Sequence, residues 1–558
     1  MLSGTEALSR LLRWKQSIVW HGSTMRLAQS EELTVPSRDP GHRVLLAGVG
    51  GPRIGFLIVL GGLALLASGL VMFTTPLGPG ILGDSYYYLT ASENLSAGRG
   101  IGRLSGGGEF RPLTHYPPFF PMAMASLQVL GLDKLDSARW VNAISAGALV
   151  LLVAVFVGSY TRGPWPALAS AVILTTSPAM LEVNVWALSE PLYLVLAWAC
   201  LGALACYLDT NRPWILAAAG VLASTAYLTR YVGSSLVLTG VVLLLAGRRD
   251  SRRRVAAAAG FGVISLAPMA AWMVRNYMLT GNLANRRILW HPIALTQLRS
   301  LVLHGVSWLA PKWLIHGRLV AILLALVLAG SVMALAVRAY KENRLVGLRP
   351  ISRFAAILAL NMALYLAQLA VSISFFDPGT SADNRILSPV YVSMIPFVVL
   401  LLAHNWNTFG RGVRVCIAAY LAILIASNAS SLVAHSLNYR TEGLGYSHRS
   451  WQDSALIKMV KELPDVPIYT NGITELYIHA SRSSYPIPWR IDSETQQVNQ
   501  DYELQLEIMR LKLVEEDARL VLFDPENLLP QQARLDDLTA GLTAVAEVED
   551  GAIYDYIP

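Results

Sequence analysis

The chain has 558 residues, 54% of them hydrophobic and 15% charged, with a mean hydropathy of +0.46. Soluble domains carry about 25% charged residues, so this composition excludes an ordinary soluble globular protein. The net charge of +7 would suggest nucleic acid in a soluble protein. Here the basic residues collect in short loops between apolar runs, as expected for cytoplasmic loops of a membrane protein, and we expect no nucleic-acid partner.

The first part of the chain, residues 1–52, is polar and lacks the apolar core and cleavage site of a secretory signal. We predict that it is a cytoplasmic N-terminal segment. Many apolar runs follow that are long enough to cross about 30 Å of hydrocarbon. They predict an all-α polytopic membrane bundle of about eleven transmembrane helices, at 53–75, 139–160, 164–181, 186–208, 213–230, 232–247, 255–277, 318–340, 353–376, 387–403 and 413–434.

Loop charge predicts the orientation of this bundle. The loop 248–254 reads RRDSRRR, and the stretch from Arg338 to Arg353 carries five basic residues against Glu342. Loops on the opposite side, including 76–138, are near charge balance. The positive-inside rule then places the N-terminus in the cytoplasm. An odd number of spans places the C-terminal tail outside a plasma or inner membrane.

The C-terminal tail, 435–558, differs in character from the bundle. It is charged and rich in proline, and it contains short β-like runs at 466–470 and 518–524 with a helix-like run, EIMRLKLVEED, between them. Alternating strands and helices are typical of an α/β domain. We predict a small extracytoplasmic α/β domain over 435–558, beside a transmembrane domain over 53–434.

The first outer loop, 76–138, is too long to be a simple connector, and loops of this length are usually functional or disordered. Asp84 lies where the chain leaves the first span. The run YYYLTASENL that follows fits a short helix lying on the membrane. Asp84 is a candidate site residue, and the alternative is that it only caps this helix.

A second acidic candidate is Glu190, in the stretch LEVNVWALSEPLYLVL at 181–196. Acidic residues in or near membrane spans are functional candidates by default. Pro191 after Glu190 suits a first helical position. The alternative for Ser189 and Glu190 is therefore a capping role.

Three arginines lie at predicted outer helix ends: Arg230, Arg275 and Arg385. This side of the membrane disfavours basic charge, so the three arginines suggest an anionic partner. A phosphate fits, because guanidinium binds its oxygens in a bidentate manner. The alternative is that each side chain snorkels from the end of a span.

Metal ligands are weakly indicated. Cys200, Cys206 and Cys416 fall inside apolar runs, without the spacing of a disulfide framework or a zinc site. The extracytoplasmic histidines, His115 among them, show no paired ligand spacing. We predict no metal site and no cofactor, although the sequence leaves dependence on a divalent metal open.

Several motifs occur in an order typical of one family: GDSYYYL with AGRGI, HYPPFFP, ALSEPLYL, LTRYVG, WMVRNYMLTGN and NRILSPVY. Together they resemble the GT-C superfamily of polyprenyl-phosphate-sugar glycosyltransferases. Within it, the chain is most similar to proteins related to protein O-mannosyltransferase (family 39) and lipid A aminoarabinose transferase (family 83). The resemblance extends from about residue 80 to 400, and the tail resembles the outer domain of many such proteins.

The resemblance implies an inverting transfer of a sugar from a polyprenyl-phosphate donor to an acceptor hydroxyl on the outer membrane face. Asp84 matches the position of the family's general base. A leaving phosphate would be stabilised by cations, a role open to Arg230, Arg275 and Arg385. The stretch containing His115 and Tyr116 would shape the loop beside the lipid entry.

The sequence departs from the family at one point. The related mannosyltransferases follow the loop aspartate with a second acid, and here Ser85 follows Asp84. A second carboxylate would come from Glu93, Glu109 or Glu190, or be absent. This departure leaves open whether the acceptor is a glycan, a lipid or a protein. It does not affect the class of enzyme that the resemblance implies.

Two other functions fit parts of the sequence. A transporter or flippase for lipid-linked sugars would show internal repeats and polar residues near the middle of its spans. This chain instead has its polar residues at outer helix ends. A polysaccharide polymerase or ligase also has an arginine-rich outer face, but would concentrate those residues in one large late loop.

Overall fold

The computed structural model describes residues 53–161, 163–247, 250–283, 288–310, 330, 350–492 and 497–557. The chain divides into two units, Met1–His42 and Arg43–Pro558, and every described residue belongs to the second. The predicted N-terminal segment 1–52 lies outside the described residues, as does the predicted span 318–340 apart from Gly330.

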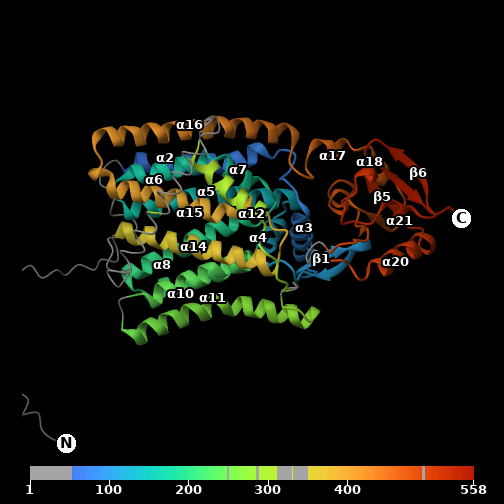
Figure 1. Ribbon diagram of the computed structural model, residues 1–558, viewed down its shortest axis with the longest axis horizontal. Helices are drawn as coiled ribbons and strands as arrows, with labels where there is room; N and C mark the ends of the chain where they lie inside the picture. The colour runs from blue at the N-terminus through green and yellow to red at the C-terminus, as the bar shows by residue number, and fades with distance from the viewer. Residues whose placement is uncertain are drawn as a thin grey trace, which may run out of the picture. The chain divides into compact units, whose positions relative to one another are not determined.

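Most of this unit is helical, and the helices from different parts of the sequence run side by side (Figure 1). Within the described residues, seven helices are long and apolar enough to cross a membrane. They are α2 (Arg53–Thr74), α5 (Lys134–Tyr160), α8 (Glu190–Thr210), α11 (Ser251–Thr280), α14 (Pro350–Phe375), α15 (Asn384–Asn405) and α16 (Arg411–Glu442). The predicted class, a helical membrane bundle, is confirmed.

Shorter apolar helices account for the other predicted spans in the described part. The predicted span 164–181 is two helices bent by 59°. The bend follows from Pro178, because the residue before a proline is disfavoured in the helical conformation, and Ser177 caps the second helix. The helices at these predicted spans are α6 (Pro164–Thr175), α7 (Pro178–Val185), α9 (Pro213–Thr229), η3 (Tyr231–Gly233) and α10 (Ser234–Leu245). Two further short helices, α4 (Phe119–Val129) and α12 (Leu295–Leu309), lie outside the predicted spans.

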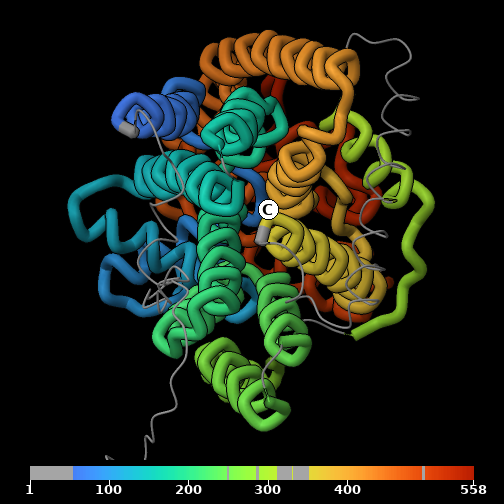
Figure 2. Tube along the Cα trace, turned by 90° about the vertical axis from the view of Figure 1, so that its left-hand side faces the viewer, coloured from blue at the N-terminus to red at the C-terminus, as the bar shows by residue number. Residues whose placement is uncertain are grey.

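The core of the bundle is formed by α5, α8 and α15, of which the apolar stretches are 72%, 67% and 67% buried. Trp198 of α8 and Tyr391 of α15 are among its largest fully buried side chains, and Phe354 of α14 packs against Trp198. The corresponding stretch of α16 is only 17% buried, and α16 lies at the edge of the bundle in Figure 2. Helices that are apolar all round suit burial in a bundle or in lipid.

The first outer loop is folded. It contains α3 (Gly83–Ser96), then a hairpin of β1 (Gly102–Ser105) and β2 (Glu109–Pro112) joined by η2 (Gly106–Gly108), and then α4. The predicted short helix is α3, and much of its surface is covered by other parts of the protein. Its side chains Tyr86, Tyr88 and Leu89 are buried against α4, α5 and the C-terminal domain.

The C-terminal domain carries a five-stranded mixed sheet of order β4-β3-β5-β7-β6. The predicted strands and the helix between them are confirmed, and α16 continues to Glu442, beyond the predicted span end at 434. The elements are α17 (Arg449–Asp453), α18 (Ala455–Glu462), β3 (Ile468–Thr470), α19 (Ile473–Glu475), η6 (Leu476–Ala480), β4 (Tyr485–Pro486), α20 (Tyr502–Glu515), β5 (Arg519–Phe523), η7 (Pro525–Asn527), α21 (Leu535–Thr539), β6 (Thr543–Val548) and β7 (Gly551–Asp555); η5 (Trp406–Thr408) lies between α15 and α16.

The C-terminal domain contacts the first outer loop closely. Ile81 forms a parallel bridge with Gly445, and the Tyr446 amide donates to the Ile81 carbonyl at 3.0 Å. At the tip of the hairpin, a Cβ on Gly106 would lie 1.8 Å from the Tyr485 ring. Glycine is therefore required at 106 for this close approach. These contacts place the sheet domain beside α3.

Candidate functional site

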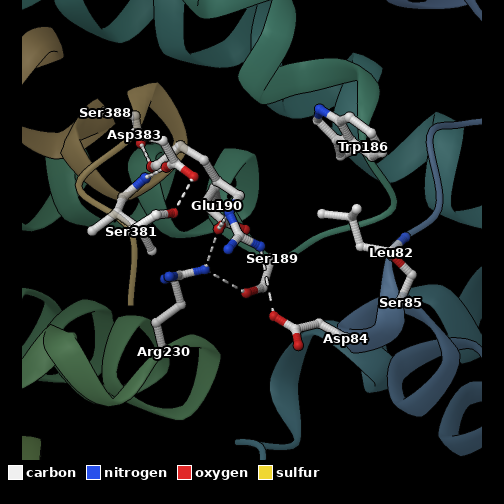
Figure 3. Close-up of polar contacts among 12 residues, drawn as sticks. Leu82, Asp84, Ser85, Trp186, Ser189, Glu190, Arg230, Ser381, Asp383 and Ser388 are labelled. Atoms are coloured by element: carbon white, nitrogen blue, oxygen red, sulfur yellow. Dashed lines mark hydrogen bonds and ion pairs between the residues drawn. The ribbon is translucent and has the colours of Figure 1, made fainter. Parts of the chain in front are cut away.

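Four charged side chains come together at the end of the bundle next to α3. Arg230 Nη1 lies 2.7 Å from Glu190 Oε1, and Arg385 Nε lies 3.5 Å from the same oxygen. Arg385 Nη1 is also 3.6 Å from Asp84 Oδ2. Figure 3 shows Arg230 and Asp84 on either side of Ser189 and Glu190. Four of the predicted site residues thus form one continuous chain of ion pairs.

The four residues come from distant parts of the sequence, and helix ends bring them together. Asp84, Glu190 and Arg385 lie in the first turns of α3, α8 and α15. Arg230 follows the last residue of α9 in an extended conformation, with φ −148°. Three helix N-termini therefore meet here. A helix N-terminus carries partial positive charge and unpaired N–H groups, which favours anions.

Glu190 is 2% exposed, with arginine on two sides. Removing a carboxylate from water costs several kcal/mol, which only good pairing offsets. The two guanidinium groups supply the opposite charge, while neither Glu190 carboxylate oxygen has a partner in hydrogen-bond geometry among the described residues. With Asp84 as the second acid, the cluster of two acids and two bases has no formal net charge.

Asp84 is the more accessible acid, since its side chain is 44% exposed. The Tyr116 hydroxyl donates to Asp84 Oδ1 at 2.8 Å. Burial and the neighbouring Asp84 carboxylate raise the pKa of Tyr116 well above its usual value, so its hydroxyl remains a donor. The residue preceding α3 is Leu82, and Asp84 does not cap the helix. The capping alternative for Asp84 is therefore wrong.

Ser189 precedes α8, but its side chain makes no capping hydrogen bond. Its hydroxyl accepts from Arg230 Nη1 at 3.3 Å and lies 3.4 Å from the Tyr88 hydroxyl. The capping alternative is wrong for Ser189 too. The hydroxyls of Ser189 and Tyr88 extend the polar cluster, and nothing in the local sequence indicated the contribution of Tyr88.

Arg275 does not join this cluster. Its guanidinium donates to the carbonyls of Leu113 at 2.8 Å and Ile101 at 3.0 Å, and it lies 4.4 Å from the centre of the Trp272 ring. It thus fastens both ends of the β1–β2 hairpin to α11. In this structure its hydrogen bonds hold the outer loop in place.

Glu93 and His115 also lie apart from the four charges. Glu93 pairs with Lys134 at 3.3 Å and accepts a hydrogen bond from the Tyr477 hydroxyl of the C-terminal domain. The His115 ring packs against Tyr116, with 4.7 Å between ring centres. Glu93 therefore links the outer loop to the C-terminal domain, and His115 supports the tyrosine that contacts Asp84.

The described residues contain no group of three or more His, Cys, Asp and Glu side chains that could hold a metal ion. The prediction about metal and cofactors is not tested by this finding. The contacts on which the site is built are those between carboxylates, guanidinium groups and hydroxyls.

A further ionisable group, Glu475, lies in the C-terminal domain and is 7% exposed. Burial raises its pKa from 4.5 to about 7. The Glu475 carboxyl therefore binds its proton more tightly in the folded protein than in the unfolded chain. The contribution to stability is complete below about pH 4.5, and about 3 kcal/mol of it is lost as the pH rises through 7.

We expect the Glu475→Gln variant to lose less stability than wild type between pH 5 and 8, in thermal unfolding of the full chain. Burial lowers the pKa of the nearby His479, which acts in the opposite direction. Comparison of variant with wild type at each pH isolates Glu475. Glu503→Gln, at an exposed position of α20, is the control. Identical pH profiles for wild type and Glu475→Gln would contradict the shift.

Comparison with known proteins gives one family match. Residues 115–274 match the model of the dolichyl-phosphate-mannose-protein mannosyltransferase family. This segment runs from the Tyr116 region to α11 and contains Glu190 and Arg230. No curated protein sequence matches the chain.

Solved structures show the same fold over most of the chain. ArnT from Cupriavidus metallidurans in the apo state matches with a TM-score of 0.54 at 13% identity, over 90% of this chain and 98% of that one. The structure of the same protein bound to undecaprenyl phosphate matches with a TM-score of 0.53 at 14% identity, over 91% of this chain and 99% of that one. An Archaeoglobus fulgidus oligosaccharyltransferase, in complex with Zn and sulfate, matches with a TM-score of 0.50 at 12% identity, over 83% of this chain and 68% of that one. The fold predicted from the motifs, that of GT-C glycosyltransferases, is confirmed.

Proposed function

Because this chain has the GT-C glycosyltransferase fold, we propose that it transfers a sugar from a polyprenyl-phosphate donor to an acceptor hydroxyl at the outer membrane face, with inversion. The observation that carries the proposal is the chain of ion pairs from Asp84 through Arg385 and Glu190 to Arg230. Two related findings support the donor class. The matching family model describes enzymes of dolichyl-phosphate-mannose, and the ArnT structure holds undecaprenyl phosphate.

The two arginines suit the departing phosphate. As the bond between the anomeric carbon and the phosphate oxygen breaks, negative charge grows on the lipid phosphate. Arg385 and Arg230 both contact Glu190 and therefore lie close together. The N-termini of α8 and α15 add partial positive charge. Fixed donors aimed at developing charge are usually the largest contribution to catalysis.

Asp84 suits the role of general base. Its accessible carboxylate can accept the proton of the acceptor hydroxyl while that oxygen attacks the anomeric carbon from the side opposite the phosphate. The Tyr116 hydroxyl holds one carboxylate oxygen in place. The other faces Arg385, so that base and phosphate-binding group are neighbours. No covalent enzyme intermediate is needed for this single displacement.

Glu190 suits the role of a positioning residue. It is too buried to meet an acceptor, but it contacts both guanidinium groups. Ion pairing of this kind fixes the orientation of the two arginines. A site held within about 0.5 Å of its productive geometry needs such supporting residues.

Replacement of Arg385 tests the proposal. We expect Arg385→Ala to raise the KM for a polyprenyl-phosphate sugar about tenfold to a hundredfold, because it removes a charge-assisted contact to the phosphate. Arg385→Lys should keep part of the donor use, since lysine retains charge but not the bidentate geometry. The measurement is steady-state transfer by the purified protein in lipid nanodiscs, with donor concentration varied.

Arg440→Ala is a matched control, because Arg440 is an exposed arginine near the end of α16 that donates to the Phe73 carbonyl and lies over the Phe73 ring, away from the four charges. It should leave donor use unchanged. An unaltered donor KM in Arg385→Ala would remove Arg385 from phosphate binding. Absence of any transfer from polyprenyl-phosphate sugars by wild type would overturn the proposed donor class.

A further inference from the structure

A large cavity lies between the first outer loop and the C-terminal domain. Its volume is about 1110 Å³. Tyr86, Tyr87 and Arg103 of the loop line one side, and Glu475 and Tyr485 of the domain line another. Small-molecule pockets are usually about 300–1,000 Å³, so this cavity has room for a ligand of several connected units.

Aromatic rings form a substantial part of its lining. Trp489 is half-buried at the cavity surface, and Tyr485 stacks on Tyr469 with 5.1 Å between ring centres and 23° between planes. Tyr87 lies on the opposite side. Such rings offer flat apolar faces with a polar group at one tip. They suit a ligand that has both apolar faces and polar edges.

The remaining lining is rich in amides and hydroxyls rather than in one kind of charge. Ser484, Asn499, Gln500 and Gln505 all lie on it. These groups both donate and accept hydrogen bonds. Sugar hydroxyls also do both, and the C–H faces of a sugar ring stack on aromatic rings. A lipid tail would instead need a continuous apolar wall.

A peptide fits this cavity less well. Extended peptides commonly bind by adding a strand to the edge of a sheet. The sheet edge at this cavity is β4, which has two residues, Tyr485 and Pro486. Proline has no N–H to donate, so this edge offers little for strand addition.

The cavity borders the start of α3, where Asp84 lies. Gly83, the neighbour of Asp84, is part of its lining. Tyr87, Arg103 and Arg111 separate it from a second cavity of about 290 Å³ that is bordered by Tyr116. The Tyr116 hydroxyl donates to Asp84, as described above. A chain-like ligand in the large cavity can therefore present its end to the general base.

We propose that the acceptor is a saccharide, and that this cavity binds its sugar residues so that a terminal hydroxyl reaches Asp84. The proposal rests on the proposed function and specifies its acceptor class. The chemistry of the lining carries it: aromatic faces lie on both sides, and amide groups lie on the side of the C-terminal domain, in a cavity that borders the residue before the candidate base.

Direct binding tests the proposal without any donor. The full-length protein in nanodiscs is titrated with neutral fluorescent tetrasaccharides of mannose, galactose or arabinose, and anisotropy is measured. At least one should bind, and Trp489→Ala should weaken its binding about tenfold. Gln500→Ala changes an exposed side chain and should also weaken binding without affecting folding. Trp290→Ala, an exposed tryptophan outside the cavity, is the control.

Transfer assays separate this proposal from the proposed function. With the bound tetrasaccharide as acceptor, Trp489→Ala should raise the acceptor KM about tenfold and leave the donor KM unchanged. Donor turnover by wild type without binding of any tetrasaccharide would overturn the saccharide acceptor while the proposed function stands. Weaker binding of a serine-containing peptide in Trp489→Ala, with no saccharide bound, would overturn it as well. If a tetrasaccharide binds but no donor is used, the proposed function fails and the binding site remains.

Discussion

Replacement of Asp84 by asparagine should lower the rate of sugar transfer by about a hundredfold to ten-thousandfold, the usual contribution of general acid–base catalysis. Asparagine keeps the shape of the side chain and can still meet Tyr116 and Arg385. It cannot take the proton of the acceptor hydroxyl. The loss should fall on kcat, with donor binding retained. Single-turnover transfer from a polyprenyl-phosphate sugar, with donor affinity determined separately, measures both quantities.

Asp465→Asn makes the same chemical change at a fully exposed position of the C-terminal domain and should leave the rate unchanged. A thermal unfolding profile for Asp84→Asn that matches wild type would show that folding is intact. Transfer by Asp84→Asn at the wild-type rate would remove Asp84 from the role of base.

Replacement of Glu190 by glutamine should destabilise the protein by about 3–5 kcal/mol, the cost of removing one partner from a buried ion pair. The variant leaves the guanidinium groups of Arg230 and Arg385 without their shared carboxylate. Both the unfolding temperature and transfer should fall, because the arginines lose the group that orients them. Thermal unfolding in detergent and donor KM are the measurements.

Glu462→Gln, at an exposed position near the end of α18, serves as the control for loss of a carboxylate. It should change stability little, because exposed charges contribute about 0–1 kcal/mol. Glu190→Gln with wild-type stability and wild-type donor KM would show that Glu190 neither supports the fold nor orients the arginines.

Sequence reasoning found the helices because apolar runs of about 20 residues suffice for that, and loop motifs singled out Asp84, Glu190, Arg230 and Arg385. It did not predict which of the three arginines lie in the same cluster. Arg275, like Arg230, lies near a helix end, but its direction around the axis of α11 depends on how that helix packs. Its partners are the carbonyls of Ile101 and Leu113, more than 150 residues away in the sequence.

The sequence also did not predict how the first outer loop packs against the rest of the protein. A short helix of mixed polarity, such as 83–96, can lie on a membrane or inside a protein, and local sequence does not decide between them. The burial of α3 depends on α4, α5 and the C-terminal domain together. Glu93 illustrates the result, since its partner Tyr477 belongs to a domain that begins hundreds of residues later.

The contact of Gly106 with Tyr485 has a consequence for evolution and engineering. The wall of the large cavity is shared, because a hairpin of the membrane part and a strand of the C-terminal domain fit together without room for a single methyl group. Neither part contains a complete pocket by itself. Exchange of the C-terminal domain between relatives should therefore fail to carry acceptor preference with it, unless the glycine hairpin is exchanged in the same step.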